Sequence, residues 1–497
     1  MSSTPPTPST SVAQDPPPAL DRDYPLRRVP VPERKGVASV AVVIAGFGFF
    51  TPTMATGGQV AGEFSFGTFL ALGAVSAAVL AVYIAALAIT SARTGLTTVL
   101  LSRLALGRLG GKWASILLGG TQIGWYGITI SMLATLLGGA LGIETTWPIV
   151  LAGGIAMAVT AYKGFRGIEF LSWISVPLMT ALCVWVTFSA VGNAGGWAGL
   201  FAHQGAGAMS VGTALTLMIG TFVSGGTQIG NWTRFASGGT LAFTITVATI
   251  LLVQFGMLFF GGVGAVGYGE PDFSNVLLML GSVALAVVLI ISNLWTTNDN
   301  AAYAFGVAGA ELFGKPDKRP FVVGGVVVGI IMALTGIADA ITAFLTMLGV
   351  LIPPLGGVLI GTFVFVWKRR DPGTELDAVP AVLWPGLLAY LGGTAAALLG
   401  SIVDIGIPRC RASSSRCSSC PCSPRRRRPA QERRTDPWPP SSWTPRSSPW
   451  TRTPGVLPCR AVSGSRTGSS PKSPGRSPFP TPTPSSMDRA GWCARDS

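Results

Sequence analysis

Residues 44–58 read Ile-Ala-Gly-Phe-Gly-Phe-Phe-Thr-Pro-Thr-Met-Ala-Thr-Gly-Gly and belong to an apolar run that starts after Lys35. Glycine and proline weaken the hydrogen-bond ladder of a helix, and threonine hydroxyls can bond the carbonyl groups that this leaves free. A second stretch of this kind, residues 219–232, reads Ile-Gly-Thr-Phe-Val-Ser-Gly-Gly-Thr-Gln-Ile-Gly-Asn-Trp. Both stretches predict helices that are interrupted near their middle.

Long apolar runs recur along most of the chain. Hydrophobic residues make up 49% of the sequence and charged residues only 11%, and a soluble fold cannot bury so many long apolar runs. A helix of about 20 residues crosses about 30 Å of hydrocarbon. The sequence therefore predicts an all-α polytopic membrane protein with eleven transmembrane helices, near residues 37–57, 67–90, 114–140, 148–162, 168–191, 211–232, 241–267, 276–310, 321–337, 341–367 and 380–402.

The basic residues of the first 408 positions alternate with this order of helices. They occupy the N-terminal segment and every second loop or its edges, whereas the other loops carry acidic residues and the single histidine but no lysine or arginine. Basic loops stay on the cytoplasmic side of a membrane. We therefore expect a plasma-membrane protein with a disordered cytoplasmic N-terminus (1–35), a transmembrane domain (36–408) and a C-terminal tail (409–497).

The two interrupted spans are the first and the sixth. Their positions five spans apart are expected of a five-plus-five inverted repeat. Interrupted helices often form the site of small-solute carriers near the middle of the bilayer, because their free backbone groups can bind a ligand. The alternative interpretation is that the glycines permit close helix packing, which is common in membranes.

The third span carries an amide beside an indole. Gln122 and Trp125 are three residues apart and therefore lie on one face of a helix. An indole can stack on a planar heterocycle while an amide bonds its polar edge. Tryptophan can also anchor a helix at the membrane interface, but Trp125 lies about twelve residues into its predicted span. This pair predicts a site for a heterocyclic solute.

The eighth span contains the most polar stretch within a predicted helix, Asn-Leu-Trp-Thr-Thr-Asn-Asp-Asn at residues 293–300. Polar groups at membrane depth are expensive and usually functional. The hydroxyls of Thr296 and Thr297, with carbonyl groups of the broken first span, would form an all-oxygen cage suited to Na⁺. Asp299 is a carboxylate within the span, and it either binds or relays a proton or pairs structurally with a neighbouring group.

The sequence contains no constellation typical of an enzyme. The only histidine, His203, falls in a predicted outside loop, and no metal-ligand spacing or phosphate-binding loop is present. Cys183 is the only cysteine before residue 409 and lies in an apolar run, as a packing cysteine would. We therefore expect a protein that is not an enzyme and has no cofactor.

Several stretches, taken together, resemble the nucleobase:cation symporter family (purine/cytosine permeases), and most closely its cytosine permease branch. The likeness runs in order through about residues 33–408. The stretches that carry it are Arg34 to Gly36, Met54 to Gly58, Arg93 to Thr98, Lys112 to Gly127, Asn293 to Ala301 and Pro353 to Gly357.

The resemblance implies a leucine-transporter-type fold with twelve helices, of which ten form the inverted repeat. It implies a base held between Trp125 and Phe222. It further implies that Gln122, Asn298 and the backbone around Thr221 bond the edge of the base. The implied sodium ligands are the carbonyls of Gly46, Phe49 and Asn293 and the side chains of Thr296 and Thr297.

These observations together predict a secondary transporter that imports a nucleobase, with cytosine favoured, by symport with Na⁺ or H⁺ through alternating access. Residues 226–234 depart from the cytosine permease pattern, which leaves purines, uracil, hydantoin and allantoin open. The expected surroundings are the lipid bilayer, with no nucleic acid and no obligate protein partner. The alternatives are a non-transporting receptor with the same pocket and an inactive truncated product.

The composition changes abruptly after residue 408. The tail holds 17 basic and 4 acidic residues, whereas the first 408 residues hold 18 and 17, so +13 of the net charge of +14 belongs to the tail. A natural disordered tail that binds nucleic acid or anionic lipid is one interpretation. We prefer a reading-frame shift just before Arg409, because GC-rich codons for Ala, Gly, Val and Leu yield Arg, Pro, Ser, Cys and Trp when read one base out of frame. Such a shift would remove the twelfth helix.

A frameshift predicts that resequencing the DNA around codon 409 will reveal a one- or two-base difference that restores an apolar reading frame. The restored frame should encode a further run of about 20 apolar residues. A single intact frame through codon 409 would show instead that the basic tail is native.

Overall fold

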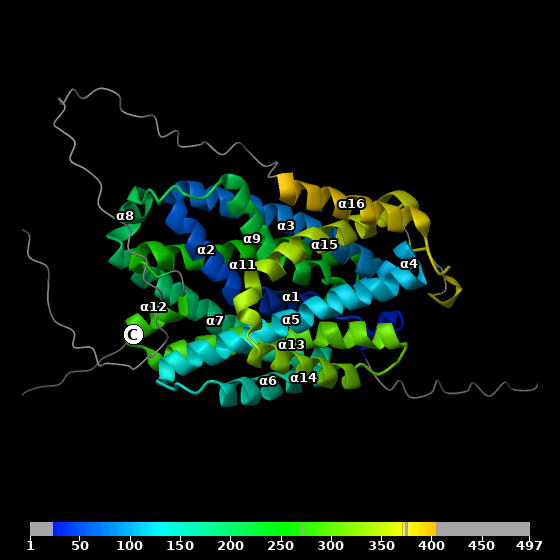
Figure 1. Ribbon diagram of the computed structural model, residues 1–497, viewed down its shortest axis with the longest axis horizontal. Helices are drawn as coiled ribbons and strands as arrows, with labels where there is room; N and C mark the ends of the chain where they lie inside the picture. Colours follow the sequence, from blue (N-terminus) through cyan, green and yellow to red (C-terminus); the bar gives the residue numbers. More distant parts are fainter. Residues whose placement is uncertain (1–22, 271–272, 370, 373–375, 404–497) are drawn as a thin grey trace, which may run out of the picture. The chain divides into compact units, whose positions relative to one another are not determined.

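The computed structural model describes residues 23–270, 273–369, 371–372 and 376–403. These residues fall within one compact unit, Met1–Ser414. The predicted tail (409–497) and the first 22 residues of the predicted disordered N-terminus lie outside the described residues. The helices are α1 (Val37–Gly48), α2 (Thr51–Glu63), α3 (Phe66–Thr94), α4 (Thr98–Leu106), α5 (Arg108–Leu141), α6 (Trp147–Tyr162), α7 (Phe165–Asn193), α8 (Gly196–Ala202), α9 (Val211–Thr227), α10 (Gly230–Thr233), α11 (Gly239–Tyr268), α12 (Phe273–Met279), α13 (Val283–Phe313), α14 (Arg319–Leu334), α15 (Ile341–Gly361) and α16 (Trp384–Val403) (Figure 1).

Each predicted span coincides with one helix or with a pair of helices. Five helices of the described part are long and apolar enough to cross a membrane, and the bent pair α1–α2 counts as a sixth. Three shorter apolar helices, α6, α14 and α16, also coincide with predicted spans. The core of the unit is therefore built from helices packed on helices, with α5 against α13 and α11 against α2 and α3.

The first span is interrupted as its sequence predicts. Helix α1 ends at Gly48, α2 begins at Thr51, and the two halves meet at an angle of 55°. Pro52 occupies the first turn of α2, where a residue without an N–H group breaks no helical hydrogen bond. The two residues between the halves, Phe49 and Phe50, thus form the break.

The sixth span is also interrupted. Helix α9 ends at Thr227, and the short helix α10 begins at Gly230 after the link Gln228–Ile229. A side chain at Gly230 would clash with α3, because its Cβ would lie 2.2 Å from the hydroxyl oxygen of Ser91. The interruption therefore follows the Gly-Gly pair and ends where close packing requires glycine.

The predictions of three segments were wrong in detail. The predicted span 276–310 is two helices, α12 and α13, separated at residues 280–282. Helices α4 and α8 lie in segments predicted as loops. The hydroxyl of Thr97 caps α4 by accepting from the N–H group of Leu100 at 3.2 Å. Helix α4 is too short for a span and contains Arg103, so apolar run length alone could not reveal it.

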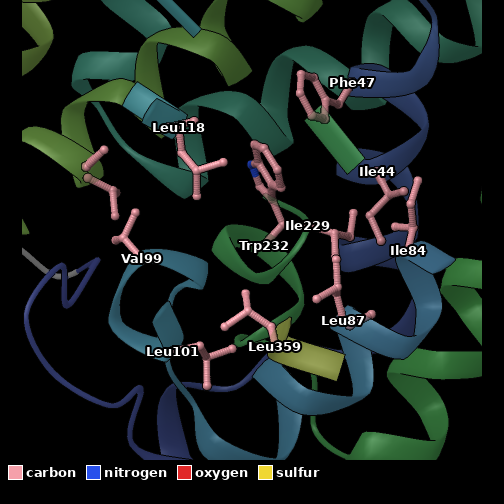
Figure 2. Packing of buried hydrophobic residues seen from close by; sticks show 14 of the residues in the cluster. Ile44, Phe47, Ile84, Leu87, Val99, Leu101, Leu118, Ile229, Trp232 and Leu359 are labelled. Carbon is pink, nitrogen blue, oxygen red and sulfur yellow. The ribbon is translucent and has the colours of Figure 1, made fainter. Parts of the chain in front are cut away.

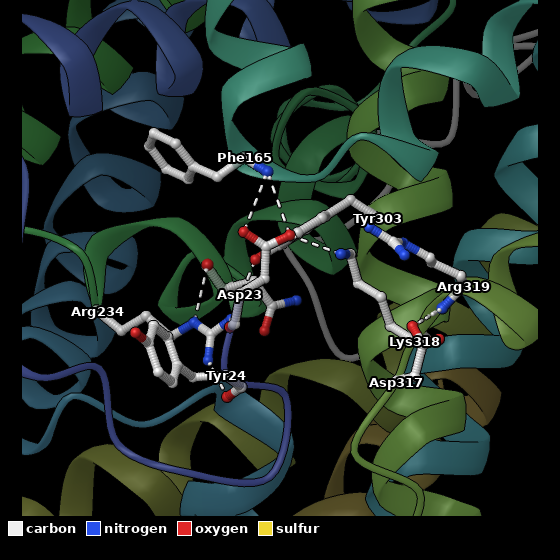
Figure 3. Close-up of polar contacts among 9 residues, drawn as sticks. Asp23, Tyr24, Phe165, Arg234, Tyr303, Asp317, Lys318 and Arg319 are labelled. Atoms are coloured by element: carbon white, nitrogen blue, oxygen red, sulfur yellow. Dashed lines mark hydrogen bonds and ion pairs between the residues drawn. The ribbon is translucent and has the colours of Figure 1, made fainter. Parts of the chain in front are cut away.

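Residues 23–35, predicted to be disordered, instead pack against the helical unit (Figure 3). The Asp23 carboxylate accepts hydrogen bonds from the N–H group of Phe165, at 3.3 Å, and pairs with Lys318 Nζ at 2.6 Å. It thus joins the start of α7 to the residue before α14. A carboxylate at the start of a helix satisfies a free N–H group and faces the positive end of the helix dipole.

Arg234 extends this network to the end of the sixth span. Its guanidinium donates to the carbonyls of Asp23 and Tyr24 and to the hydroxyl of Tyr303 on α13, at 2.5, 2.8 and 3.0 Å. The side chain is fully buried, as is that of Lys318. These contacts, which we call the N-terminal network, tie α10 to α13 and to residues 23 and 24.

We expect Asp23→Ala to loosen the N-terminal network, because it removes the carboxylate that pairs with the buried ammonium of Lys318 and accepts from the N–H group of Phe165. Loss of one partner of a buried hydrogen-bonded pair costs about 1–3 kcal/mol. Hydrogen exchange in the first turn of α7 and in α10, followed by mass spectrometry, should accelerate about 5- to 150-fold.

The matched control is Asp377→Ala, because the pair between Asp377 and Arg103 is 3.5 Å long and its carboxylate is fully exposed. Exposed pairs contribute little to stability, so this variant should exchange as the unaltered chain does. Equal exchange rates in Asp23→Ala and Asp377→Ala would show that the Asp23 carboxylate does not stabilise the first turn of α7 or α10.

Candidate substrate and cation site

A small cavity lies where the two broken spans meet α5 and α13. Its volume is about 10 Å³, close to the minimum for one water molecule. A planar base is far larger, so the surrounding side chains must move apart before one can enter. The lining residues are Phe47, Phe50, Gln122, Trp125, Thr221, Phe222, Ser224, Gly225, Thr297 and Ala301.

Trp125 is held in place by polar and aromatic neighbours. Its indole N–H donates to the hydroxyl of Ser224 on α9 at 2.9 Å. The rings of Phe50 and Phe344 meet the indole edge-on, with centroids 5.0 and 5.4 Å away. The indole orientation is thus fixed by α9, by the break of the first span and by α15. The face of the indole is therefore preformed for a planar ligand.

Phe222 is the second aromatic ring predicted for the base. It lies in the cavity wall and meets Phe47 at a centroid distance of 5.0 Å and an interplanar angle of 61°. Phe47 in turn packs on Trp232, at 4.6 Å, within the largest apolar cluster (Figure 2). Trp232 lies 6.4 Å from Tyr303 of the N-terminal network. Aromatic rings therefore fill the space between the cavity and the N-terminal network.

Gln122 offers the cavity a hydrogen-bond donor. Its side chain is 1% exposed, and its Nε2 has no partner among the described residues. A buried amide donor without an acceptor costs about 1–3 kcal/mol, which a ligand carbonyl or ring nitrogen could offset. Thr221 differs, because its hydroxyl already donates to the carbonyl of Met218 at 2.9 Å. Its backbone groups lie within the continuous helix α9 (Val211–Thr227).

Asn298 lies apart from the other predicted substrate residues. It is absent from the cavity wall, and its amide oxygen accepts from the hydroxyl of Thr129 on α5. Its amide nitrogen lies 3.2 Å from the sulfur of Met157 on α6. In this conformation Ala301, one turn further along α13, takes its place in the wall.

Sequence reasoning missed five residues of the wall, Phe47, Phe50, Ser224, Gly225 and Ala301. A usable signal exists for Ser224, which follows Thr221 by three residues and so shares its helix face. The aromatic residues flanking the first break are a second signal. Nothing in the sequence distinguishes Ala301 from the other alanines of α13.

The predicted sodium ligands largely converge. The hydroxyl of Thr297 donates to the carbonyls of Phe49, at 3.2 Å, and Asn293, at 3.1 Å. The hydroxyl of Thr296 also donates to the Asn293 carbonyl, at 3.0 Å. The bond to Phe49 thus brings an oxygen of α13 to the first break, whereas the two bonds to the Asn293 carbonyl lie within α13. The carbonyl and hydroxyl oxygens are neutral, hard ligands, the type that Na⁺ or another hard cation prefers.

Gly46 is placed one turn before Phe49 on α1. A side chain there would collide with α7, because a Cβ would lie 2.6 Å from the hydroxyl oxygen of Ser172. Asp299 is fully buried beside Asn300, whose amide donates to its carboxylate at 3.1 Å. It does not line the cavity. Its carboxylate therefore lies outside the set of oxygens around Thr297.

Comparison with known proteins identifies the family. The permease family for cytosine/purines, uracil, thiamine and allantoin matches residues 29–410. Cytosine permeases of Escherichia coli strain K12 and of Escherichia coli O157:H7 are each 34% identical over 379 residues, which cover 76% of this chain and 90% of the relative.

Solved structures show the same fold. Mhp1, a nucleobase-cation-symport-1 family transporter, in a closed conformation with bromovinylhydantoin bound, matches with a TM-score of 0.65 and 19% identity, over 76% of this chain and 93% of Mhp1. Its inward-facing conformation matches with a TM-score of 0.62 and 17% identity, over 75% and 91%. The expected all-α polytopic fold of the leucine-transporter type is thus confirmed. The chain belongs to the family of permeases for cytosine/purines, uracil, thiamine and allantoin, and it is a multi-pass membrane transporter rather than an enzyme.

Proposed function

We propose that the chain imports a nucleobase, with cytosine favoured, together with a cation, and that it does so by alternating access. The observation that carries this proposal is the cavity between the two broken spans, which combines the fixed indole of Trp125 with the unpaired amide donor of Gln122. The cytosine permeases at 34% identity favour cytosine within the family's range of substrates.

In the proposed complex the base lies between the faces of Trp125 and Phe222, and Gln122 donates to its polar edge. Entry requires Phe47 and Phe50 to withdraw, because the cavity is too small for a base in the described conformation. Asn298 would bond the base only after leaving Thr129, so we assign its contact to a different stage of the cycle.

The proposed orientation places the N-terminus in the cytoplasm of a plasma-membrane protein, because the basic loops lie on that side. The N-terminal network then closes the cytoplasmic exit. Release of the base requires that network and the aromatic rings between Phe47 and Tyr303 to separate, while the opposite side closes. Such movement of one half against the other around a fixed site is alternating access.

We assign the coupling cation as Na⁺, bound by the carbonyls of Gly46, Phe49 and Asn293 and the hydroxyls of Thr296 and Thr297. The contact between the Thr297 hydroxyl and the Phe49 carbonyl, at 3.2 Å, supports this assignment, because it brings an oxygen of α13 next to an oxygen of the first break. Coupling to H⁺ is the alternative, and the buried Asp299 carboxylate is the group that favours it.

Uptake of radiolabelled cytosine into proteoliposomes containing the purified full chain should respond to an inward Na⁺ gradient. Replacement of external Na⁺ by choline should lower the initial rate at least about tenfold, because the cation supplies the driving force. Stimulation by an inward H⁺ gradient alone would assign the coupling to protons. Cytosine binding without uptake under any gradient would indicate a receptor instead.

We expect Trp125→Ala to weaken cytosine binding about 5- to 150-fold, because stacking of a base on an aromatic ring contributes about 1–3 kcal/mol. Binding of labelled cytosine to purified protein measures the change. Trp185→Ala removes the same ring from the exposed side of α7 and serves as the control. Equal affinities for the Trp125 and Trp185 variants would refute the stacking assignment.

A further inference from the structure

Asn293 presents its two oxygens to two different parts of the molecule. Its side chain is buried, and its amide oxygen accepts from both the N–H group of Thr51, at 3.1 Å, and the hydroxyl of Thr51, at 2.6 Å. Thr51 is the first residue of α2, the second half of the broken first span. The first N–H groups of a helix have no acceptor within it. Asn293 therefore caps α2 from a different helix.

The backbone carbonyl of Asn293 belongs to the proposed cation site. It accepts from the hydroxyls of Thr296 and Thr297, and the Thr297 hydroxyl also reaches the carbonyl of Phe49. The backbone carbonyl of Asn293 is thus bonded to proposed cation ligands, and its side-chain amide is bonded to α2. The break between α1 and α2 is only two residues long, so both sets of bonds meet there.

The same contacts reach the substrate cavity. Phe50 directly precedes Thr51, lines the cavity and packs edge-on against Trp125 at 5.0 Å. A shift of the first turn of α2 consequently moves one wall of the cavity. One chain of contacts from Asn293 to the indole of Trp125 therefore runs through Thr51 and Phe50.

A bound cation would change the hydrogen bonds of this chain. A hydroxyl oxygen that binds a cation turns its one hydrogen away from the ion, so the hydroxyl of Thr297 can no longer donate to the carbonyl of Phe49 or of Asn293, and the cation attracts these carbonyl oxygens instead. Asn293 is then fixed by ion contacts, and its amide fixes Thr51. We propose that Asn293 is a positioning residue that transmits cation binding to α2 through Thr51, and so sets how strongly the cation raises base affinity.

This inference rests on the proposed cation symport, and a pair of isosteric variants tests it separately. Thr51→Val removes the hydroxyl that donates to Asn293 and keeps the shape of the side chain and the N–H bond. Thr53→Val makes the same change two residues further along α2, where the hydroxyl is buried and has no partner within the described part of the chain. Thr53→Val therefore controls for the loss of a buried hydroxyl in the same half-helix.

The experiment measures the dissociation constant of labelled cytosine for the purified full chain, without Na⁺ and at saturating Na⁺, with choline as the replacement. The ratio of the two constants is the coupling between the sites, and it must also appear as the effect of cytosine on Na⁺ affinity. We expect Thr51→Val to lower this ratio about fivefold, the effect of about one hydrogen bond, with the Na⁺-free constant within about twofold of the unaltered chain. Thr53→Val should keep the full ratio, and Thr51→Ser, which retains the hydroxyl, should restore it.

Each other outcome counts against the inference. An unaltered ratio in Thr51→Val, or equal losses in the two valine variants, would overturn it. A parallel loss of affinity with and without Na⁺ would assign Thr51 a purely structural role. Should Thr51→Val fail to fold, Thr51→Ala is measured against Thr53→Ala in the same way. If the unaltered chain binds cytosine with no response to Na⁺, the sodium assignment itself fails and this inference fails with it.

Discussion

The fold depends on how the two broken spans satisfy the backbone groups that their breaks set free. A polar backbone group without a partner is costly inside a membrane, so an interrupted helix persists only where neighbours supply donors and acceptors. At the first break, Asn293 accepts from the N–H group of Thr51, and Thr297 donates to the carbonyl of Phe49.

At the sixth break, one neighbouring side chain satisfies a backbone carbonyl, and one side chain of the break itself bonds to a neighbouring helix. There Thr98 of α4 donates to the carbonyl of Thr227 at 3.2 Å, while the side chain of Gln228 donates to the carbonyl of Leu118 on α5 at 3.3 Å. The buried hydroxyls and amides of α4 and α13 thus satisfy backbone groups at the two breaks. This requirement explains why the polar stretch of α13 is so dense, since it serves the first break and the proposed cation site together.

The N-terminal network and the substrate cavity are stabilised by different kinds of interaction. The N-terminal network relies on buried charges that make hydrogen bonds and an ion pair, whereas aromatic rings fill the space between this network and the cavity. Buried ion pairs are weak sources of stability because desolvation offsets most of their attraction, but they fix one geometry. A contact set of that kind suits the closing and opening that the proposed alternating access requires.

Regular periodicity and local composition predicted much of this protein. Run length gave the spans, the Gly-Pro-Thr and Gly-Gly stretches located both breaks, and the spacing of Gln122 and Trp125 placed two cavity residues together on one helix face. These features are local, because helix formation and its interruption depend on residues within a few positions. The break at residues 280–282 and helix α4 also have local signals, which run length does not detect: Gly281 adopts a φ of 71° after α12, and Thr97 caps α4. The packing of residues 23–35 lacks such a signal, because it depends on contacts with residues that are distant in sequence.

Only the tertiary structure decided which polar groups face the cavity and which face another helix. Asn298 and Asn293 both lie in the polar stretch of α13, yet one bonds Thr129 on α5 and the other caps α2. The sequence by itself determined the all-helical membrane fold, its two interruptions and a set of polar residues at mid-span. The assignment of each polar group to a partner required the packed structure, because residues on different faces of one helix meet different neighbours, and those neighbours are distant in sequence.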